Sequence, residues 1–258
     1  MEAPAGNVLV TGAARRIGAA IARDLAAHGH GVVIHYHKSG DEAKTLQAEI
    51  VAAGGRAVLC EADLAKAGEA EALIDRAGIA LGEPLTALVN NASLFAFDRA
   101  ADVTRDALER HYQINVIAPV ILARDLVRQL PDGMQGVIVN LLDQKLANPN
   151  PDFFSYSLSR YAMAGATMLM AQEFAGRCRV NGVAPGITLP SADQSDAAFA
   201  AVARENLLER VSNAQYLADA VRMLLRNDAI NGQCLWVDGG QRFMNQPRDV
   251  MFMEQGAA

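Results

Sequence analysis

The sequence predicts an α/β fold in which a parallel sheet is covered by helices on both faces. Short β-branched runs alternate with Ala- and Leu-rich stretches of helical length along the chain. Several runs are apolar throughout, as in Val137–Val139, which is typical of strands buried on both faces. This alternation favours a doubly wound parallel sheet. No linker or repeat interrupts the pattern, so we expect a single domain over residues 1–258.

The predicted elements follow one another with short connections. Seven runs are predicted as strands: Asn7–Thr11, Gly31–Tyr36, Arg56–Glu61, Thr86–Asn90, Gly136–Leu141, Arg179–Val183 and Gln233–Val237. Helices are predicted between them: Ile17–His28, Asp41–Ala53, Lys66–Ala80, Thr104–Leu130, Ser155–Ala175 and Asn213–Arg226. Pro119 interrupts the longest of these, so two helices are expected there. The polar segment Thr188–Glu209 follows the carboxyl end of a strand, where ligands bind in open α/β sheets. It is interpreted as either a mobile substrate lid or an ordinary surface loop.

Composition and charge exclude several classes of protein. Hydrophobic residues make up 51% and charged residues 20% of the chain, which excludes intrinsic disorder. A net charge of −6 disfavours nucleic acid or an anionic membrane as a main partner. The three cysteines have no paired spacing, so neither a disulfide framework nor a zinc site is expected. The start resembles no signal peptide, and we expect a cytoplasmic protein that acts on a small molecule.

A glycine-containing turn follows the first predicted strand and opens the first helix. Its sequence is Thr-Gly-Ala-Ala-Arg-Arg-Ile-Gly, over residues 11–18. Such a turn brings backbone N–H groups against a pyrophosphate. Two arginines at a helix N-terminus oppose the helix dipole, which favours a bound anion there; the alternative is a pair of solvated loop arginines. The residues predicted to bind the cofactor here are Gly12, Arg15, Arg16, Ile17 and Gly18.

The chain resembles the short-chain dehydrogenase/reductase family, because several short motifs of that family occur in the same order along nearly its whole length. They comprise the glycine turn, Asp63-Leu64, Asn90-Asn91-Ala92-Ser93, Asn115, Tyr156, Pro185-Gly186 and Val237-Asp238-Gly239-Gly240. The family's middle glycine is Arg16 here, and Ser93 replaces another glycine. The resemblance implies a Rossmann-type fold, with Asn115 as a catalytic residue that holds a proton-carrying water. It also implies cofactor contacts from Asp63, Leu64, Asn91, Ala92, Ser93, Tyr156, Arg160, Pro185, Gly186 and Thr188.

A narrower resemblance points to the pteridine reductase branch, which includes dihydromonapterin reductases. It rests on Arg16 in the glycine turn, on the strand end His-Tyr-His-Lys-Ser over residues 35–39, on Phe95, and on Asp143 where the wider family has a catalytic serine. The branch reduces dihydropteridines or dihydrofolate with NADPH. Two alternatives stay open: a carbonyl or 3-oxoacyl reductase, and a weakly active or non-catalytic dinucleotide-binding protein.

The end of the second predicted strand indicates which dinucleotide binds. NAD-specific sites place Asp or Glu there to accept from the ribose 2′-hydroxyl. His37, Lys38 and Ser39 stand there instead, and their donors and charge suit the 2′-phosphate of NADPH. We expect the acids that follow, Asp41 and Glu42, to begin the next helix. The nearby histidines lack a suitably spaced acid or cysteine, so no metal site is expected.

Tyr156 is the predicted proton donor. A free tyrosine has a pKa near 10, so a neighbouring cation must lower it. In the family that cation is a lysine four residues later; here the position holds Arg160. Charge and spacing are kept, but arginine cannot readily lose a proton and therefore cannot join a proton relay. We expect weak activity that an Arg160→Lys variant would increase.

Asp143 is the most informative acid in the sequence. A carboxylate repels the oxyanion that develops during ketone reduction, but it accepts from ring N–H groups such as those of pterins. The alternative is a strand-end aspartate that caps a loop. Phe95 either stacks on a flat substrate or belongs to the core, and Lys145 either adds a second cation or points to solvent. The predicted substrate-binding residues are Arg16, Ser93, Phe95, Asp143 and Tyr156.

The helix predicted from Ser155 indicates assembly. It is apolar on most faces, more than a helix with one exposed side should be. The family commonly forms tetramers through this helix, so the resemblance implies a homotetramer. The alternative is a helix fully buried within its own monomer.

Overall fold

The computed structural model describes residues 6–190 and 196–252. In that part of the chain seven strands form one sheet: β1 (Asn7–Val10), β2 (Gly31–Tyr36), β3 (Arg56–Glu61), β4 (Ala87–Asn90), β5 (Gly136–Leu141), β6 (Cys178–Pro185) and β7 (Cys234–Val237). The strand order is β3-β2-β1-β4-β5-β6-β7, and every neighbouring pair is parallel. The predicted fold class is confirmed, and the predicted strand ends are correct to within two residues.

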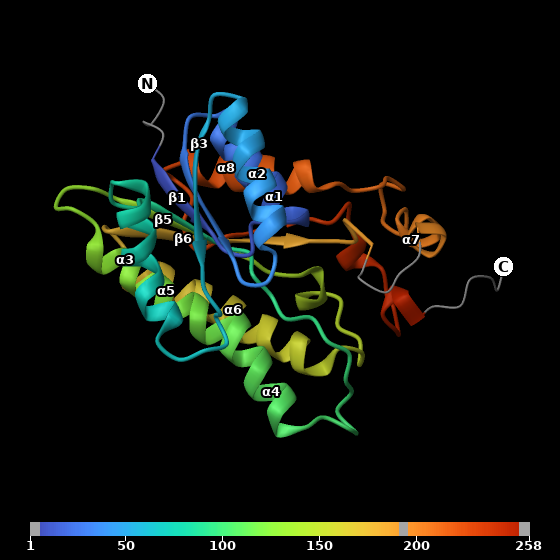
Figure 1. The fold of residues 1–258 in the computed structure, drawn as a ribbon. Coiled ribbons are helices and arrows are strands. Elements are labelled where there is room, and N and C mark those ends of the chain that lie inside the picture. Colours follow the sequence, from blue (N-terminus) through green and yellow to red (C-terminus); the bar gives the residue numbers. More distant parts are fainter. Residues whose placement is uncertain (1–5, 191–195, 253–258) are drawn as a thin grey trace.

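Helices cover both faces of the sheet (Figure 1). One layer holds α1 (Arg16–Ala27), α2 (Gly40–Ala52) and α8 (Ala214–Arg226); the other holds α3 (Glu69–Leu81), α5 (Ala118–Gln129) and α6 (Phe154–Glu173), with α4 (Arg105–Tyr112) beside α6. Each layer packs on its own buried cluster. Val8 and Val10 belong to one cluster and Leu9 to the other, because side chains alternate between the faces of a strand.

The long predicted helical stretch is two helices joined without a loop. A π-helical turn, Gln113–Ile117, links α4 to α5, and Pro119 lies in the first turn of α5. The division into two helices is therefore correct. The π turn itself was not predicted, and such turns are frequent at functional sites.

The chain after β6 returns over the carboxyl edge of the sheet. A short helix, α7 (Asp196–Val202), lies within the predicted lid segment, whose residues 191–195 fall outside the described part of the chain. Its movement as a lid stays a prediction. Three 3₁₀ helices, η2 (Gln144–Leu146), η3 (Gln241–Phe243) and η4 (Val250–Phe252), complete this edge. No helix within residues 6–190 and 196–252 is both long and apolar enough to cross a bilayer.

Candidate active site

A cavity of about 760 Å³ lies where the strands end. Its lining includes residues that directly follow β1 to β6, as expected for a ligand site in an open α/β sheet. The structure brings nearly all predicted site residues to its wall: Gly12, Arg15, Arg16, Ile17, Gly18, His37, Lys38, Ser39, Asp63, Leu64, Asn91, Ala92, Ser93, Phe95, Asp143, Tyr156, Arg160, Pro185, Gly186 and Thr188. Asn115 is the predicted site residue that is not part of this lining.

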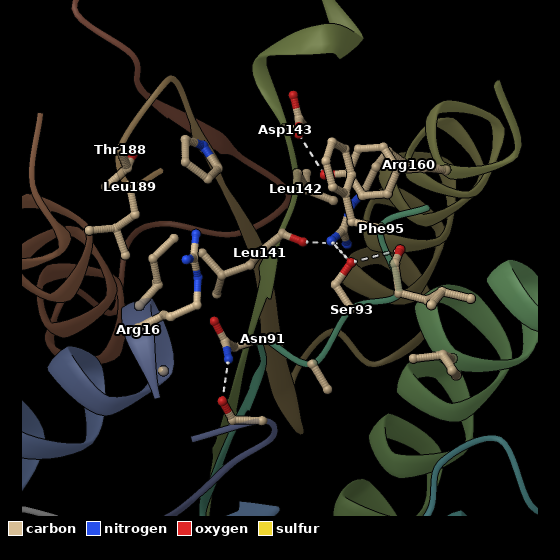
Figure 2. A pocket seen from close by; sticks show the side chains of 18 of the residues that line it. Arg16, Asn91, Ser93, Phe95, Leu141, Leu142, Asp143, Arg160, Thr188 and Leu189 are labelled. Carbon is tan, nitrogen blue, oxygen red and sulfur yellow. Dashed lines mark hydrogen bonds between the residues drawn. The ribbon is translucent and has the colours of Figure 1, made fainter. Parts of the chain in front are cut away.

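The two ends of the cavity carry different chemistry. Figure 2 shows Arg16 with Thr188 and Leu189 on one side of the cavity and Phe95, Asp143 and Arg160 on the other. The first side adjoins the glycine turn and the second adjoins the start of α6. A ligand that spans the cavity therefore meets cations at one end and a tyrosine–carboxyl pair at the other.

The glycine turn is packed closely against the segment after β4. Gly12 has a φ of +61°, and a Cβ on it would lie 3.0 Å from the Cα of Ala92. A Cβ on Gly18 would lie 2.4 Å from the carbonyl oxygen of Gly12. Asn91 holds this arrangement, because its amide donates to the carbonyls of Thr11 and Gly12 at 2.8 and 3.0 Å. The absence of both side chains therefore allows the turn to pack this closely on Ala92 and on the start of α1.

Arg16 occupies the position of the family's middle glycine and adopts a backbone conformation that favours glycine. Its φ is +57°, in the left-handed region that costs a non-glycine residue about 1–2 kcal/mol. Helix α1 has neither a side-chain cap on its first N–H groups nor an acid in its first turn. Burial lowers the pKa of Arg16, and the neighbouring charge of Arg15 lowers it further. The turn therefore gathers positive charge and N–H groups that an anion satisfies.

His35 anchors the turn from β2, and it was not predicted as a site residue. The Gly12 N–H donates to its Nδ1 at 3.0 Å, and its Nε2 lies 3.1 Å from the carbonyl oxygen of Ala62. Nδ1 is thus an acceptor and Nε2 carries the proton, which is the neutral imidazole. Burial lowers the pKa of His35 from 6.5 to about 4. One neutral side chain connects the glycine turn to the residues after β3.

The end of β2 fits a nucleotide with a 2′-phosphate. His37, Lys38 and Ser39 line the cavity, and no acid stands at the strand end itself. Asp41 and Glu42 lie in the first turn of α2, as predicted. Cationic and hydroxyl donors suit a phosphate monoester, and together with the glycine turn these residues fit NADPH.

Tyr156 and Asp143 form a direct pair at the other end. The Tyr156 hydroxyl donates to Oδ2 of Asp143 at 2.5 Å, and the Lys145 backbone N–H donates to Oδ1 at 2.8 Å. Burial raises the pKa of Asp143 against the effect of these contacts. Burial also raises the pKa of Tyr156 far above its usual value, while the charge of Arg160 opposes the rise and Asp143 adds to it. The pair holds its protons more tightly than the same groups in water.

Arg160 is a fixed cation beneath the tyrosine. Its two terminal nitrogens donate to the carbonyl of Leu141 at 2.9 Å and to Oγ of Ser93 at 2.7 Å (Figure 2). The guanidinium carbon lies 4.9 Å from the centre of the Tyr156 ring. Arg160 therefore supplies charge to Tyr156 and also joins the end of β5 to the loop after β4.

Asn115 binds protein groups with its whole side chain. Its amide oxygen accepts from the Leu94 N–H at 2.8 Å, and its amide nitrogen donates to the Leu94 carbonyl at 3.0 Å and to Oγ of Ser159 at 2.9 Å. Ser159 in turn donates to the carbonyl of Tyr156. Asn115, in the π turn, thus connects the loop after β4 to α6. Its predicted role in holding a water stays a prediction.

The positions of Phe95 and Lys145 in the structure decide between the alternatives that the sequence left open for each of them. Phe95 is 42% exposed, stacks on Phe153 with ring centres 4.0 Å apart, and meets the Tyr156 ring edge-on at 4.7 Å. It is therefore a ring at the cavity wall and not a core residue. Lys145 is buried, with Nζ 2.8 Å from the Asp249 carboxylate. The expectation that it points to solvent is wrong, because a carboxylate far along the chain receives its charge.

The part of the cavity wall that comes from the end of the described chain was not predicted. These residues are Gln241, Gln246, Asp249, Val250 and Met251. They follow the last recognisable motif and have no helical or strand periodicity. Only the requirement that buried charges be paired connects Asp249 to the site, and that requirement becomes visible only in three dimensions.

Comparisons with known proteins agree with this geometry. Residues 6–200 match the family model described as short chain dehydrogenase. An alternative dihydrofolate reductase 1, FolM, from Brucella canis, whose structure contains NADP, is 40% identical, with a TM-score of 0.90 and coverage of 96% of this chain and 98% of that one. Pteridine reductase 1 from Leishmania tarentolae is 31% identical over 90% of this chain and 94% of the relative. A short-chain dehydrogenase from Burkholderia cenocepacia, in complex with NADP, is 34% identical, with a TM-score of 0.83 and coverage of 91% of this chain and 96% of that one. The chain belongs to the short-chain dehydrogenase/reductase family of oxidoreductases.

Proposed function

We propose that this chain is an NADPH-dependent reductase of dihydropteridine rings, a class that includes dihydrofolate. One observation carries the proposal: a carboxyl group, Asp143, is hydrogen-bonded to Tyr156 at the cavity wall beside the exposed ring of Phe95. A carboxylate accepts from the N–H groups of a pteridine, whereas it repels the oxyanion of a reduced ketone. The relatives named as pteridine and dihydrofolate reductases support the same substrate class.

The two ends of the cavity would hold the two reactants. Arg15, Arg16 and Lys38 near the glycine turn would hold the nucleotide phosphates, and the ring of Phe95 would hold the pteridine. When bound, NADPH supplies a hydride to the carbon of a ring C=N bond. The chain's own residues supply the proton that the ring nitrogen then needs.

We propose that Tyr156 donates that proton and that Asp143 assists it. The tyrosine is protonated at neutral pH, and burial raises its pKa further. Its hydroxyl proton points at Asp143 in this structure; in the proposed reaction it turns to the ring nitrogen, while Asp143 accepts from ring N–H groups. Arg160 lies 4.9 Å from the ring centre and stabilises negative charge on the phenol oxygen, although it cannot itself pass a proton on.

A preference for NADPH over NADH tests the nucleotide end. One charge-assisted contact to the 2′-phosphate contributes about 1.5–3 kcal/mol, so affinity for NADPH should exceed that for NADH by about tenfold or more. Isothermal titration of both nucleotides measures this. A Lys38→Ala variant should narrow the ratio, and equal affinities in the natural protein would contradict the assignment.

A weakly active or non-catalytic dinucleotide-binding protein is a second candidate. The observation in its favour is the guanidinium of Arg160, which is held by Leu141 and Ser93 at the position of the family's relay lysine. Such a protein binds NADPH and oxidises it slowly or not at all.

NADPH oxidation assays distinguish these functions. The substrates are dihydrobiopterin, dihydrofolate, dihydromonapterin and a 3-oxoacyl compound, with Tyr156→Phe as the inactive control. Turnover of a pteridine supports the proposal. Turnover of the 3-oxoacyl compound alone would assign a carbonyl reductase, and tight NADPH binding without turnover would assign the binding protein.

We further propose that the chain assembles as a homotetramer through α6. The face of α6 that carries Tyr156 and Arg160 is buried, but Tyr161, Met168 and Leu169 are 43%, 57% and 68% exposed. The alternative of a helix fully buried in its own monomer is therefore wrong. A second copy that covers these side chains removes their apolar surface from water.

A further inference from the structure

The end of the described chain forms a wall of the cavity. Residues 246–252, here called the C-terminal clamp, contribute Gln246, Asp249, Val250 and Met251 to the lining. The clamp lies beyond the residues that match the family model, which end at position 200. It packs on the loop between Asp143 and α6, the loop that carries the proposed site acid.

Two ion pairs join the clamp to this loop. Nζ of Lys145 lies 2.8 Å from the Asp249 carboxylate, and both side chains are nearly buried, with 5% and 11% of their surfaces exposed. Asp152, which is fully buried, accepts from Nε of Arg248 at 2.7 Å and from the backbone N–H of Asp249 at 2.8 Å. Because unpaired buried charges are costly, each pair fixes the clamp against the loop.

Aromatic rings also connect the clamp to Phe95, the ring proposed to contact the substrate. Phe252 of the clamp packs on Phe153 with ring centres 5.9 Å apart, and Phe153 stacks on Phe95 at 4.0 Å. Phe153 has a φ of +57°, a conformation that costs a bulky residue free energy. Contacts on several sides of the ring hold it there.

We propose that the C-terminal clamp positions Asp143 and Phe95 for the pteridine, and that Lys145 and Asp249 are its positioning residues; this inference rests on the proposed function. Asp249 holds the side chain of Lys145, and the backbone N–H of Lys145 donates to Asp143. The clamp thereby acts on the Asp143–Tyr156 pair without touching the reacting atoms.

The charge of Asp249 also sets the electrostatics around Asp143. The groups that face Asp143 are Lys145 from the loop and Tyr156, Arg160 and Tyr161 from α6. Asp249 forms an ion pair with Lys145 and so offsets its charge. Without Asp249 the amine keeps its acceptors on Asn150 and Asp152, and the unopposed charge of Lys145 lowers the pKa of Asp143 further.

An Asp249→Asn variant of the full chain tests the clamp. We expect kcat/KM for a dihydropteridine to fall about tenfold to hundredfold, because misplaced catalytic groups lose that much rate. NADPH affinity should stay within about twofold of wild type, because the glycine turn lies at the other end of the cavity. Carboxyl ¹³C NMR, assigned with Asp143→Asn, should show Asp143 titrating at lower pH in the variant.

An Asp24→Asn variant is the matched control. Asp24 is also a buried acid in an ion pair, 2.9 Å from Arg222 and between α1 and α8. Its loss should lower the melting temperature but leave kcat/KM and the Asp143 titration as in wild type. A Lys145→Met/Asp249→Leu double variant removes both charges together and should recover most of the activity, since apolar pairs replace buried ion pairs at little cost.

The outcomes separate this inference from the proposed function. If wild type reduces no pteridine, the function fails, while the NMR titration still tests the clamp. An Asp249→Asn protein with unchanged kcat/KM and unchanged Asp143 titration would overturn the clamp. If that variant does not fold, the same titration in the double variant decides: a wild-type curve supports cancellation of the two charges, and a raised pKa contradicts it.

Discussion

Asp143 shows how one residue serves two structural purposes at the same site. It accepts from the Lys145 N–H as the cap of η2 and from the Tyr156 hydroxyl as part of the pair. The interpretation as a loop cap is confirmed, while the role of Asp143 toward a substrate stays a prediction. The two are compatible, because one carboxylate oxygen accepts from the loop and the other accepts from Tyr156 at the cavity wall.

An Asp143→Ser variant should therefore change substrate preference. A serine hydroxyl donates where the carboxylate accepts, so pteridine reduction should weaken and reduction of simple carbonyls should improve relative to it. The measurement is the ratio of kcat/KM for dihydrobiopterin to that for a 3-oxoacyl substrate. An unchanged ratio would place Asp143 in the loop cap alone.

An Arg160→Lys variant separates the charge of this residue from its geometry. The variant lacks the two guanidinium nitrogens that donate to Leu141 and Ser93, so the free energy of unfolding should fall by about 1–3 kcal/mol. It gains an amine that can take part in proton transfer, and a missing relay step typically costs 10²–10⁴-fold; kcat should therefore rise. Chemical denaturation and steady-state kinetics on both forms measure the two effects, with NADPH affinity measured alongside. A kcat that stays level or falls would show that only the charge is needed.

At the scale of elements, the sequence predicted what local patterns determine. The strands were recognisable because apolar runs alternate with helical stretches, and the first turn of α2 was recognisable from Asp41 and Glu42. The π turn at Asn115 was not, because its extra residue leaves no mark on periodicity. The left-handed backbone of Arg16 was not predicted, although Arg16 stands where the family has a glycine. Long-range contacts such as that between Gly12 and His35 have no local signal at all.

The contact between β2 and the glycine turn predicts a dependence on acid pH. The pKa of His35 is about 4 in the folded chain against 6.5 when unfolded. The unfolded state therefore binds more protons between these values, so stability is complete above pH 6.5 and falls as the pH drops toward 4. The loss is on the order of 3 kcal/mol. Protonated Nδ1 also no longer accepts from Gly12, so NADPH affinity should fall in the same window.

A His35→Asn variant isolates this effect from other titrating groups. The variant should be less stable than wild type at pH 7, and its stability should change less between pH 6.5 and 4. Melting temperatures and NADPH titrations across that range provide both readings. Parallel pH curves for the two proteins would mean that His35 does not carry the dependence.

At the scale of the whole molecule, the site depends on segments that lie far apart in the chain. The cavity wall draws on residues from Gly12 to Met251, so its two ends close only when the sheet, α6 and the C-terminal clamp are all in place. The sequence predicted the residues that carry motifs and missed those, such as Asp249, whose importance comes from their partners. In the proposed assembly, the site would also depend on contacts with other copies of the chain.

Helix α6 connects assembly to catalysis. Its buried face positions Tyr156 and Arg160, and its exposed face presents Met168 and Leu169. If copies meet through that face, packing holds the helix from both sides. A Leu169→Asp variant places a charge in the interface but, at 68% exposure, disturbs little within one chain. Light scattering should give a mass near four times 27.5 kDa for wild type and near 27.5 kDa for the variant.

The control for this prediction is Ile79→Asp. Ile79 is 81% exposed on α3, so the same change there adds the same charge to a face that α6 does not use. It should leave the mass of the assembly as in wild type. The Leu169→Asp protein should also lose turnover more than it loses NADPH affinity, because the tyrosine lies on the loosened helix while the glycine turn does not. A wild-type mass near 27.5 kDa at micromolar concentration would refute the assembly, and a dissociated variant with full turnover would show that α6 is rigid without it.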